Sequence, residues 1–298
     1  MSSWSKLVEG ELRLLPDVES VLGVVRRFSE GGRSIIVSSV GVFRSAGKYL
    51  AHLVNSLSGI NAFYVQPHEL MYYVAPYNEG RELDILLIAT PGGLSDLYLL
   101  LDQLVLTGHR VALVTEPLPE SMKARFGSVE LAEVQLGRMG LLKLLASLAY
   151  SVSKVARSEL RRRADRVAGE CLSLAQVADE LVEMYSEELK AIRGVFLEPH
   201  IVTYTPTMEP VAEMVSLGYG KSLAIMADIS SAHLYVDRFA RKVLLFTTDV
   251  EVYTVRYYLT KIAERGGKVV EVRVRTDPLT APLYALLLLY YIDIGGGG

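Results

Sequence analysis

The sequence predicts two parallel-sheet α/β domains. Its 298 residues suit two domains of about 150 residues each. Short β-branched runs alternate with longer helical patterns in both halves of the chain, and the second half repeats the order of the first. A strand–helix–strand order that recurs in this way is typical of parallel sheets covered by helices.

The first half contains four contiguous apolar runs, as expected for strands that are covered on both faces. Strands are predicted at residues 33–39, 62–65, 84–90 and 110–115, helices at 42–57, 95–107 and 137–158, and a short helix from Pro67. In the second half, strands are predicted at 200–205, 222–227, 242–247 and 268–273, and helices at 208–217, 228–239, 251–265 and 279–291.

The two halves share a local signature. Thr107 to Val114 resembles Arg265 to Val272, 158 residues further along the chain. Each segment places a glycine at a helix C-terminus, then a basic residue, then a buried strand. This spacing is that of a domain and not of a solenoid repeat.

The predicted organisation is an N-terminal domain at residues 1–156, a helical linker at 157–193 and a C-terminal domain at 194–298. The linker is densely charged and includes the run Arg161 to Arg163. The run is interpreted as a solvated helix face that bridges the domains, with a phosphate-binding patch as the alternative.

Composition excludes several classes. The net charge of −3 gives no electrostatic reason to expect nucleic acid as a partner. The single cysteine, Cys171, excludes a disulfide framework and a CxxC zinc site, and five scattered histidines imply no metal. No other cofactor is expected. The apolar run Leu279 to Ile294 is shorter than a membrane span, and the N-terminus has no apolar signal region.

A cytoplasmic protein without a membrane partner is therefore expected. The scarcity of asparagine and glutamine, together with the single cysteine, favours a source from a hot environment.

Ligands of parallel sheets bind at the carboxyl ends of the strands, where helix N-termini present free N–H groups to anions. Four loops qualify, at residues 38–45, 89–96, 203–209 and 246–251. In the second loop, Gly92 and Gly93 allow close approach of a ligand, and Thr90 and Ser95 offer hydroxyl groups. Ser95 is equally a candidate N-cap of the next helix.

The first loop leaves similar alternatives open. Ser38, Ser39 and Ser45 are candidates for caps or for ligand contacts. Arg44 lies at a helix start, where a cation opposes the helix dipole, so it points to solvent or pairs with an anion. The motifs GxGxxG, GxxxxGK[ST], HExxH and GxSxG are absent, which disfavours Rossmann dehydrogenases, P-loop enzymes and serine hydrolases of the nucleophile-elbow type.

Two segments resemble the double sugar-isomerase (SIS) family. One runs from Ile35 to Gly41 and leads into Gly47, and the other runs from Ile85 to Asp96 and is followed by the glycine signature at Thr107. The length, the helical linker and the apolar final helix are similar to those of archaeal bifunctional phosphoglucose/phosphomannose isomerases. The resemblance implies two flavodoxin-like, three-layer α/β/α domains that bind phosphosugars and pair as homodimers.

The chain departs from the family motif SxSGxTxE. Aligned through Gly92, it has Ala89, Pro91, Leu94 and Asp96 at the Ser, Ser, Thr and Glu positions. In the second half, Thr247, Asp249, Val250 and Val252 stand where Ser, Ser, Gly and Thr would be, and Val42 replaces a phosphate-binding serine in the first loop.

The resemblance also implies catalytic roles. His233 lies where the family's ring-opening histidine is expected, although it is equally a surface or interface histidine. The family's base falls on Leu217 or Gly218, neither of which can accept a proton. Glu213, one turn earlier, is the provisional base.

Glu209 is a further candidate for the base, or a dipole-matched structural acid. His68 and Glu69 could face a cleft between subunits or be an exposed helix start. Asp249 and Glu251 argue against phosphate binding at the loop of the second domain, because like charges repel.

The leading expectation is a phosphosugar-binding protein whose implied activity is aldose–ketose isomerisation of the glucose or mannose 6-phosphate to fructose 6-phosphate type. The expected binding residues are Ser38, Ser39, Gly41, Arg44, Thr90, Gly92, Gly93 and Ser95. The alternatives are a non-catalytic phosphosugar sensor, a structural homodimer, or a protein of the same topology that binds another small anion.

Overall fold

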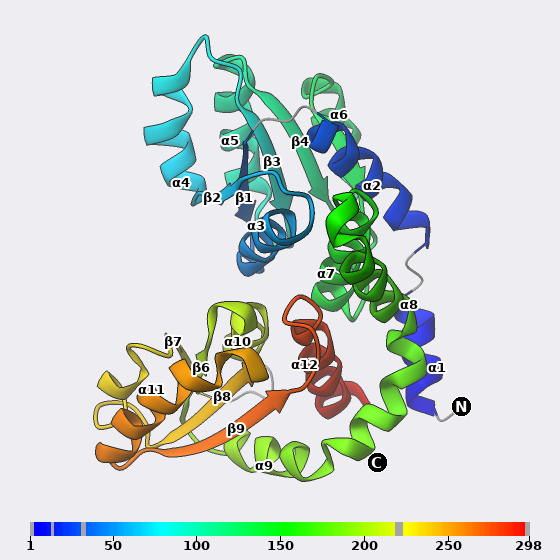
Figure 1. The fold of residues 1–298 in the computed structure, drawn as a ribbon. Coiled ribbons are helices and arrows are strands. Elements are labelled where there is room, and N and C mark those ends of the chain that lie inside the picture. The colour runs from blue at the N-terminus through cyan, green and yellow to red at the C-terminus, as the bar shows by residue number, and fades with distance from the viewer. Residues whose placement is uncertain (1–2, 13–14, 31–33, 218–222, 296–298) are drawn as a thin grey trace. The chain divides into compact units, whose positions relative to one another are not determined.

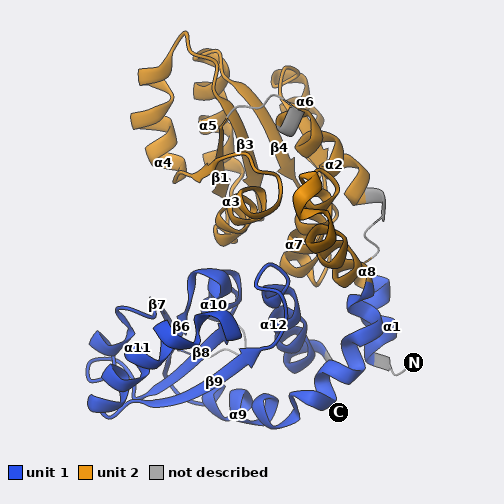
Figure 2. Ribbon diagram, in the orientation of Figure 1, with its two compact units in different colours: residues 1–10, 173–298 blue, residues 11–172 orange. Residues whose placement is uncertain are grey.

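The computed structural model describes residues 3–12, 15–30, 34–217 and 223–295. The chain forms two compact units (Figure 2). Unit 2 comprises residues 11–172, and unit 1 comprises residues 1–10 and 173–298. Each unit contains one parallel sheet, as the sequence predicts (Figure 1). The boundary between the units falls inside helix α8 (Arg161–Met184).

Unit 2 has a five-stranded sheet in the order β2-β1-β3-β4-β5. This is the flavodoxin-like order, in which the direction of winding reverses between the first and third strands. Its strands are β1 (Ile35–Val40), β2 (Ala62–Tyr64), β3 (Asp84–Ala89), β4 (Arg110–Thr115) and β5 (Glu130–Glu133). Val40 is paired with Ala89, so β1 and β3 end side by side.

Helices cover both faces of this sheet and give three layers. On one face, α2, α3 and α7 pack on one another. On the other, α5, α6 and the π-helical turn η1 bury apolar side chains against β3 and β4. The bounds are α2 (Leu15–Glu30), α3 (Ser45–Leu57), α4 (Pro67–Glu69), η1 (Leu70–Val74), η2 (Pro76–Asn78), α5 (Leu94–Leu106), α6 (Glu120–Arg125), α7 (Gly140–Lys154) and η3 (Ser158–Leu160). Helix α1 (Ser3–Leu12) precedes them, and its residues up to Gly10 belong to unit 1.

Unit 1 repeats this order with four strands, β7-β6-β8-β9. Helix α11 and the turn η6 share one apolar cluster with the sheet, while α10 packs against α12. The bounds are α9 (Ser186–Phe196), β6 (His200–Tyr204), η4 (Pro206–Met208), α10 (Glu209–Ser216), β7 (Ala224–Asp228), η6 (Ala232–Leu234), β8 (Lys242–Thr248), η7 (Asp249–Glu251), α11 (Val252–Glu264), β9 (Lys268–Val274), α12 (Ala281–Tyr290) and η8 (Tyr291–Gly295). No helix in the described residues combines the length and apolar character needed to cross a membrane.

The repeated glycine signature is confirmed in atomic detail. Gly108 and Gly266 both end a helix with positive φ, at 76° and 74°. In each unit, the amide after this glycine donates to a carbonyl five residues back, from His109 to Leu104 (3.1 Å) and from Gly267 to Ile262 (3.0 Å). The two halves therefore end the helix before the fourth strand of each sheet in the same way.

Three features differ from the sequence prediction. No helix was predicted before residue 33, where α1 and α2 lie. Strand β5 and helix α6 were not anticipated, because Glu130 and Glu133 interrupt the short apolar pattern of the strand. The helix predicted at residues 228–239 is wrong. The carboxylate of Asp228 accepts hydrogen bonds from the amide (2.8 Å) and hydroxyl (2.5 Å) of Ser230, which folds the chain into a turn instead, and only η6 is helical there.

The loops that follow β1 and β3 are in contact through two glycines. A Cβ added to Gly93 would lie 2.6 Å from the amide nitrogen of Gly41, and one added to Gly41 would lie 2.2 Å from the carbonyl oxygen of Thr90. Hydrogen bonds join the same loops, from the Val42 amide to the Pro91 carbonyl (3.1 Å) and from the Thr90 amide to the Val40 carbonyl (3.0 Å). Backbone contacts therefore hold the two loops of this carboxyl edge in one arrangement.

We predict that Gly93→Ala lowers the free energy of unfolding by about 1–3 kcal/mol, because the added methyl group would collide with backbone that cannot move aside. Gly169→Ala is the matched control, since a Cβ at this helical position meets nothing within 4 Å. It should stabilise the protein by about 0.5–1 kcal/mol. Urea unfolding measures both values, and an unchanged Gly93→Ala midpoint would contradict the loop packing.

A buried ion pair joins α2 and α7, which pack on one another on the same face of the sheet. The Lys143 ammonium lies 2.5 Å from the Asp17 carboxylate, and both side chains are about nine-tenths buried. Asp17 also accepts the amide of Gln135 (3.4 Å). The pair fixes α2 on α7, since either charge would be costly to bury alone.

Lys143→Met should therefore reduce the free energy of unfolding by about 3–5 kcal/mol, because it leaves the Asp17 carboxylate buried without its cation. The double variant Asp17→Leu/Lys143→Met should recover much of this loss. Lys154→Met, at the end of the same helix, should change stability by less than about 1 kcal/mol. If the double variant were no more stable than Lys143→Met in guanidinium unfolding, the pair would not explain the loss.

Candidate functional site

The N-terminus of α3 is closed to anions by its own surroundings. The amide of Phe43 donates to the hydroxyl of Thr90 (3.0 Å), and that of Val42 donates to Pro91. Within the first turn of α3, the amides of Ala46 and Gly47 donate to carbonyls of the preceding turn (3.3 and 3.2 Å). The glycine loop after β1 thus has its donors engaged within the fold.

The N-terminus of α5 is open. The backbone amides of Leu94, Ser95 and Asp96 have no hydrogen-bond partner among the described residues, and the first amide bonded in the helical pattern is that of Leu97, which donates to Gly93. Three free N–H groups at the start of a 13-residue helix form a site for an anion. Asp96 is the one acidic residue in the first turn of α5.

Ser95 is not the N-cap of α5. Gly93 occupies the cap position and provides no side chain, and Ser95 is the second helical residue. Gly93 is needed there because of its close approach to Gly41, which excludes a serine or aspartate cap. The Ser95 hydroxyl is consequently exposed at the helix start.

The expected binding residues fall into two groups. Gly92, Arg44 and Ser95 are exposed at the carboxyl edge of the sheet, and Gly92 has a φ of 78°. The others lie within the fold. Thr90 donates to the Val40 carbonyl (3.1 Å), and Ser39 donates to the Arg44 carbonyl (2.5 Å).

Ser38 is fully buried in β1, and its hydroxyl has no partner among the described residues. Ser39 and Thr90 hold the loops through these hydrogen bonds, and Gly41 and Gly93 hold them through close packing.

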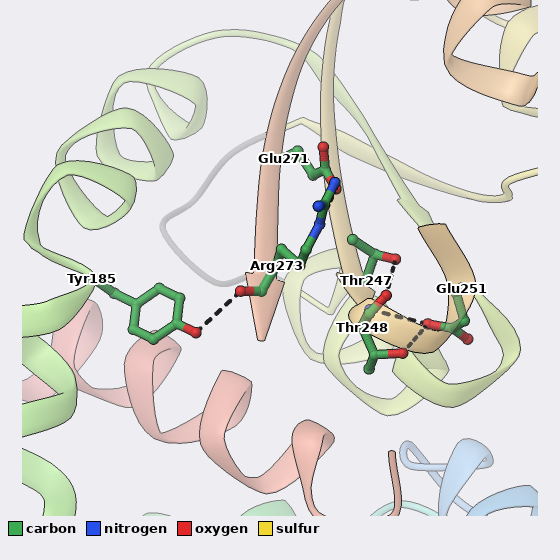
Figure 3. A network of polar contacts seen from close by, with 6 residues as sticks. All are labelled: Tyr185, Thr247, Thr248, Glu251, Glu271 and Arg273. Atoms are coloured by element: carbon green, nitrogen blue, oxygen red, sulfur yellow. Dashed lines mark hydrogen bonds and ion pairs between the residues drawn. The ribbon is translucent and has the colours of Figure 1, made fainter. Parts of the chain in front are cut away.

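In unit 1, the N-terminus of α11 is occupied by a carboxylate of the protein itself. Glu251 accepts hydrogen bonds from the amide (3.1 Å) and the hydroxyl (2.8 Å) of Thr248 in a capping box (Figure 3). Asp249 is exposed in the same turn. A second anion here would be repelled, as the sequence predicts.

The other helix start at this edge is acidic. Burial, followed by the charges of Glu209, Asp228 and Glu213, raises the pKa of Tyr204 to about 12. Pro210 removes one of the N–H groups of the first turn of α10. The charges of Glu209 and Glu213, the two candidate bases, therefore both help to keep the half-buried Tyr204 protonated. The same negative charges disfavour binding of an anion at the start of α10.

Glu213 and His233 are not assembled within unit 1. Strand β7 lies on one side of β6 and β8 on the other, so right-handed crossovers place α10 and η6 on opposite faces of the sheet. His233 forms no hydrogen bond or ion pair with any described residue, and its Nδ1 is buried. Leu217 is half exposed at the end of α10, and Gly218 lies outside the described residues.

The remaining candidates lie on exposed surface. His68 and Glu69 are both exposed, and His68 stacks on Tyr72 with ring centroids 6.3 Å apart. Arg161 is exposed and pairs with Asp165 on its own helix (3.2 Å), which supports a solvated helix face. Within the described ranges, no group of three or more His, Cys, Asp or Glu side chains could hold a metal ion.

Sequence reasoning missed two features of these edges. Tyr204 was not singled out, because its acidic neighbours come from two different elements, α10 and β7. The capping box could have been found, since Thr248 and Glu251 have the spacing of the Thr-x-x-Glu signature.

Neither known protein families nor curated proteins give a match to this chain. Solved structures do. The C-terminal domain of glucosamine-fructose-6-phosphate aminotransferase from Francisella tularensis is 12% identical, with a TM-score of 0.65 over 94% of each chain. Glucosamine-6-phosphate deaminase from Thermotoga maritima is 13% identical, with a TM-score of 0.61 over 95% of each chain.

Tagatose-6-phosphate ketose/aldose isomerase from Escherichia coli is 14% identical, with a TM-score of 0.60 over 100% of this chain and 95% of the other. The likeness thus extends over both units of the chain. At these identities it establishes a shared fold, and the function must be argued from the site.

Proposed function

We propose that this chain is an SIS-type protein that binds a sugar phosphate at the carboxyl edge of the unit 2 sheet, with the phosphate on the N-terminus of α5. The observation that carries the proposal is the set of three unpartnered amides at Leu94, Ser95 and Asp96. The three structures compared above are of proteins named for sugar phosphates, which supports the same ligand class.

The other helix starts favour this placement by elimination. Four amides at the start of α3 are engaged, those of Val42, Phe43, Ala46 and Gly47. Helix α10 begins among acids, and α11 carries its own carboxylate. In the proposed site, the amides and the Ser95 hydroxyl bind the phosphate, and Arg44 adds a positive charge from the neighbouring loop. Thr90, Gly41 and Gly93 are positioning residues, because they hold the two loops together.

Ser95→Asp should weaken binding of fructose 6-phosphate at least about tenfold, because a carboxylate at the helix start repels the phosphate and competes for the same amides. The fold should be retained, since an acid in the first turn suits the helix dipole. Isothermal titration measures the affinity. Inorganic phosphate and unphosphorylated fructose serve as ligand controls.

Ser186→Asp is the matched control variant, because Ser186 is an exposed residue in the first turn of α9. The affinity of Ser186→Asp for fructose 6-phosphate should equal that of the unaltered protein. Arg44→Ala should weaken binding about three- to tenfold through loss of one charge. Equal affinity of Ser95→Asp and the unaltered chain would remove α5 from the proposed site.

The second candidate is aldose–ketose isomerisation, with His233 assisting ring opening and Glu213 as the base. It is favoured by the cluster of Glu209 and Glu213 at Tyr204 and by the unpartnered Nδ1 of His233. Because η6 and α10 lie on opposite faces of one sheet, the pair would act on one sugar only across a homodimer. The alternative use of the site is a non-catalytic sensor or structural homodimer.

Interconversion of fructose 6-phosphate with glucose or mannose 6-phosphate, assayed at elevated temperature, separates these uses. The isomerase proposal predicts turnover that falls at least about a hundredfold in His233→Ala and in Glu213→Gln, while His52→Ala, an exposed histidine on α3, retains it. Binding without turnover would leave the sensor or structural role. A monomer in sedimentation analysis would exclude sites shared between subunits.

A further inference from the structure

The outer edge of β9 in unit 1 lacks a neighbour that its counterpart has in unit 2. Both strands are fourth in the same winding order, and Arg110 and Lys268 occupy equivalent first positions in the pairing. Strand β4 pairs on its outer side with β5. Among the described residues of unit 1, no strand pairs with the outer side of β9.

One hydrogen bond of the missing strand is replaced by a side chain. In unit 2, the carbonyl of Thr115 accepts the amide of Val134, which continues β5 (2.8 Å). The equivalent carbonyl, that of Arg273, accepts the hydroxyl of Tyr185 instead (3.0 Å; Figure 3). The same hydroxyl accepts the amide of Arg275 (3.3 Å).

These contacts define which backbone groups of β9 point outward. Since Arg273 faces outward and successive residues alternate, Val269 and Glu271 also direct their N–H and C=O groups away from β8. Apart from the Arg273 carbonyl, none of the groups of these three residues on this side has a hydrogen-bond partner among the described residues. They form a ladder of donors and acceptors that an added strand could complete.

Space for such a strand is present beside this ladder. A cavity of about 330 Å³ lies between β9 and the junction of α8 and α9, lined by Met184, Tyr185, Glu188, Glu271, Arg273 and Arg275. A second cavity of about 210 Å³ shares Met184, Tyr185 and Arg275 and is extended by apolar side chains, among them Leu181 and Val177. The two cavities together form a slot, which is polar along β9 and apolar at α8.

Among the described residues, Lys268 and Arg275 form no ion pair, and they lie at the two ends of the outer edge of β9. Glu180, Glu188 and Glu271 line the cavities beside the strand, together with Arg273 and Arg275. Glu271 is paired with Arg273 (2.6 Å), whereas the guanidinium of Arg275 has no ion pair among the described residues.

The strand that fills the equivalent place in unit 2 is itself acidic. Strand β5 has the sequence Glu-Leu-Ala-Glu, and its Glu130 pairs with Arg110 of β4 (3.1 Å). Lys268 occupies the position of Arg110 in the pairing, so the internal template indicates an acidic segment.

We propose that the outer edge of β9 binds an extended acidic segment of a partner protein, which adds to the sheet as its fifth strand. Backbone pairing with Val269, Glu271 and Arg273 supplies the affinity, and a carboxylate opposite Arg275 supplies selectivity. Tyr185 marks the end of the pairing. The inference concerns unit 1 alone and does not depend on sugar phosphate binding.

The test uses the full chain and a capped peptide with the sequence of residues 129–135, which is that of β5. The peptide should bind with a dissociation constant in the micromolar range, as measured by fluorescence anisotropy. Glu271→Pro should weaken binding at least about tenfold, because it removes an outward N–H without breaking a bond to β8. Arg275→Glu should weaken it at least about threefold.

Arg256→Glu, an equal charge reversal on the exposed side of α11, should leave peptide affinity unchanged. Hydrogen exchange gives a second measurement that needs no variant. The amides of Glu271 and Arg273 should exchange rapidly in the free protein and become protected when the peptide binds.

Three results would overturn the proposal. The first is equal peptide binding by the unaltered chain, Glu271→Pro and Arg275→Glu. The second is protection of the Glu271 and Arg273 amides in the free protein. The third is that the unaltered chain does not bind the peptide. If, in that case, Glu271→Pro changes the oligomeric state of the protein, the edge of β9 pairs with a second copy of this chain.

Discussion

The close packing of Gly41 on Gly93 is the contact on which the arrangement of the unit 2 sheet edge depends. It brings the loops after β1 and β3 together at the point where the winding of the sheet reverses. In this position the loop of β3 uses up the amides that precede α3, through Pro91 and the Thr90 hydroxyl. The same contact requires a glycine at the cap position of α5. That helix therefore begins without a side-chain cap, and its first amides remain available to a ligand.

The two sheets share a scaffold and differ at their carboxyl edges. Both wind in the same order, and both end the helix before the fourth strand with a glycine of positive φ. In unit 2 a helix start is left open, whereas in unit 1 Glu251 fills one start and acids surround the other. This difference is the reason for proposing one anion site per chain, in unit 2. The divergence extends to the outer edge, where β5 completes one sheet and Tyr185 provides a single bond to the other.

Much of the fold could be predicted from sequence because its signals are local. The apolar strands, the glycines at 108 and 266, and the acidic helix start at Glu251 are each encoded by a short segment of sequence. The failures were different. Residues 228–239 look helical, but the Asp228 carboxylate bonds to Ser230 and favours a turn. The assignment of Ser95 as a cap failed because the approach of Gly41 to Gly93 joins loops some fifty residues apart. The separation of His233 from Glu213 likewise depends on strand order, which no single segment encodes.

The most direct measurement is a titration of the labelled full chain with fructose 6-phosphate, followed through the backbone amide signals in nuclear magnetic resonance spectra. Because hydrogen bonds to a phosphate shift amide protons, the account predicts saturable shifts at Leu94, Ser95 and Asp96, with little change at the engaged amides of Ala46 and Gly47. Shifts confined to the start of α11, or no shifts in either unit at millimolar ligand, would contradict it.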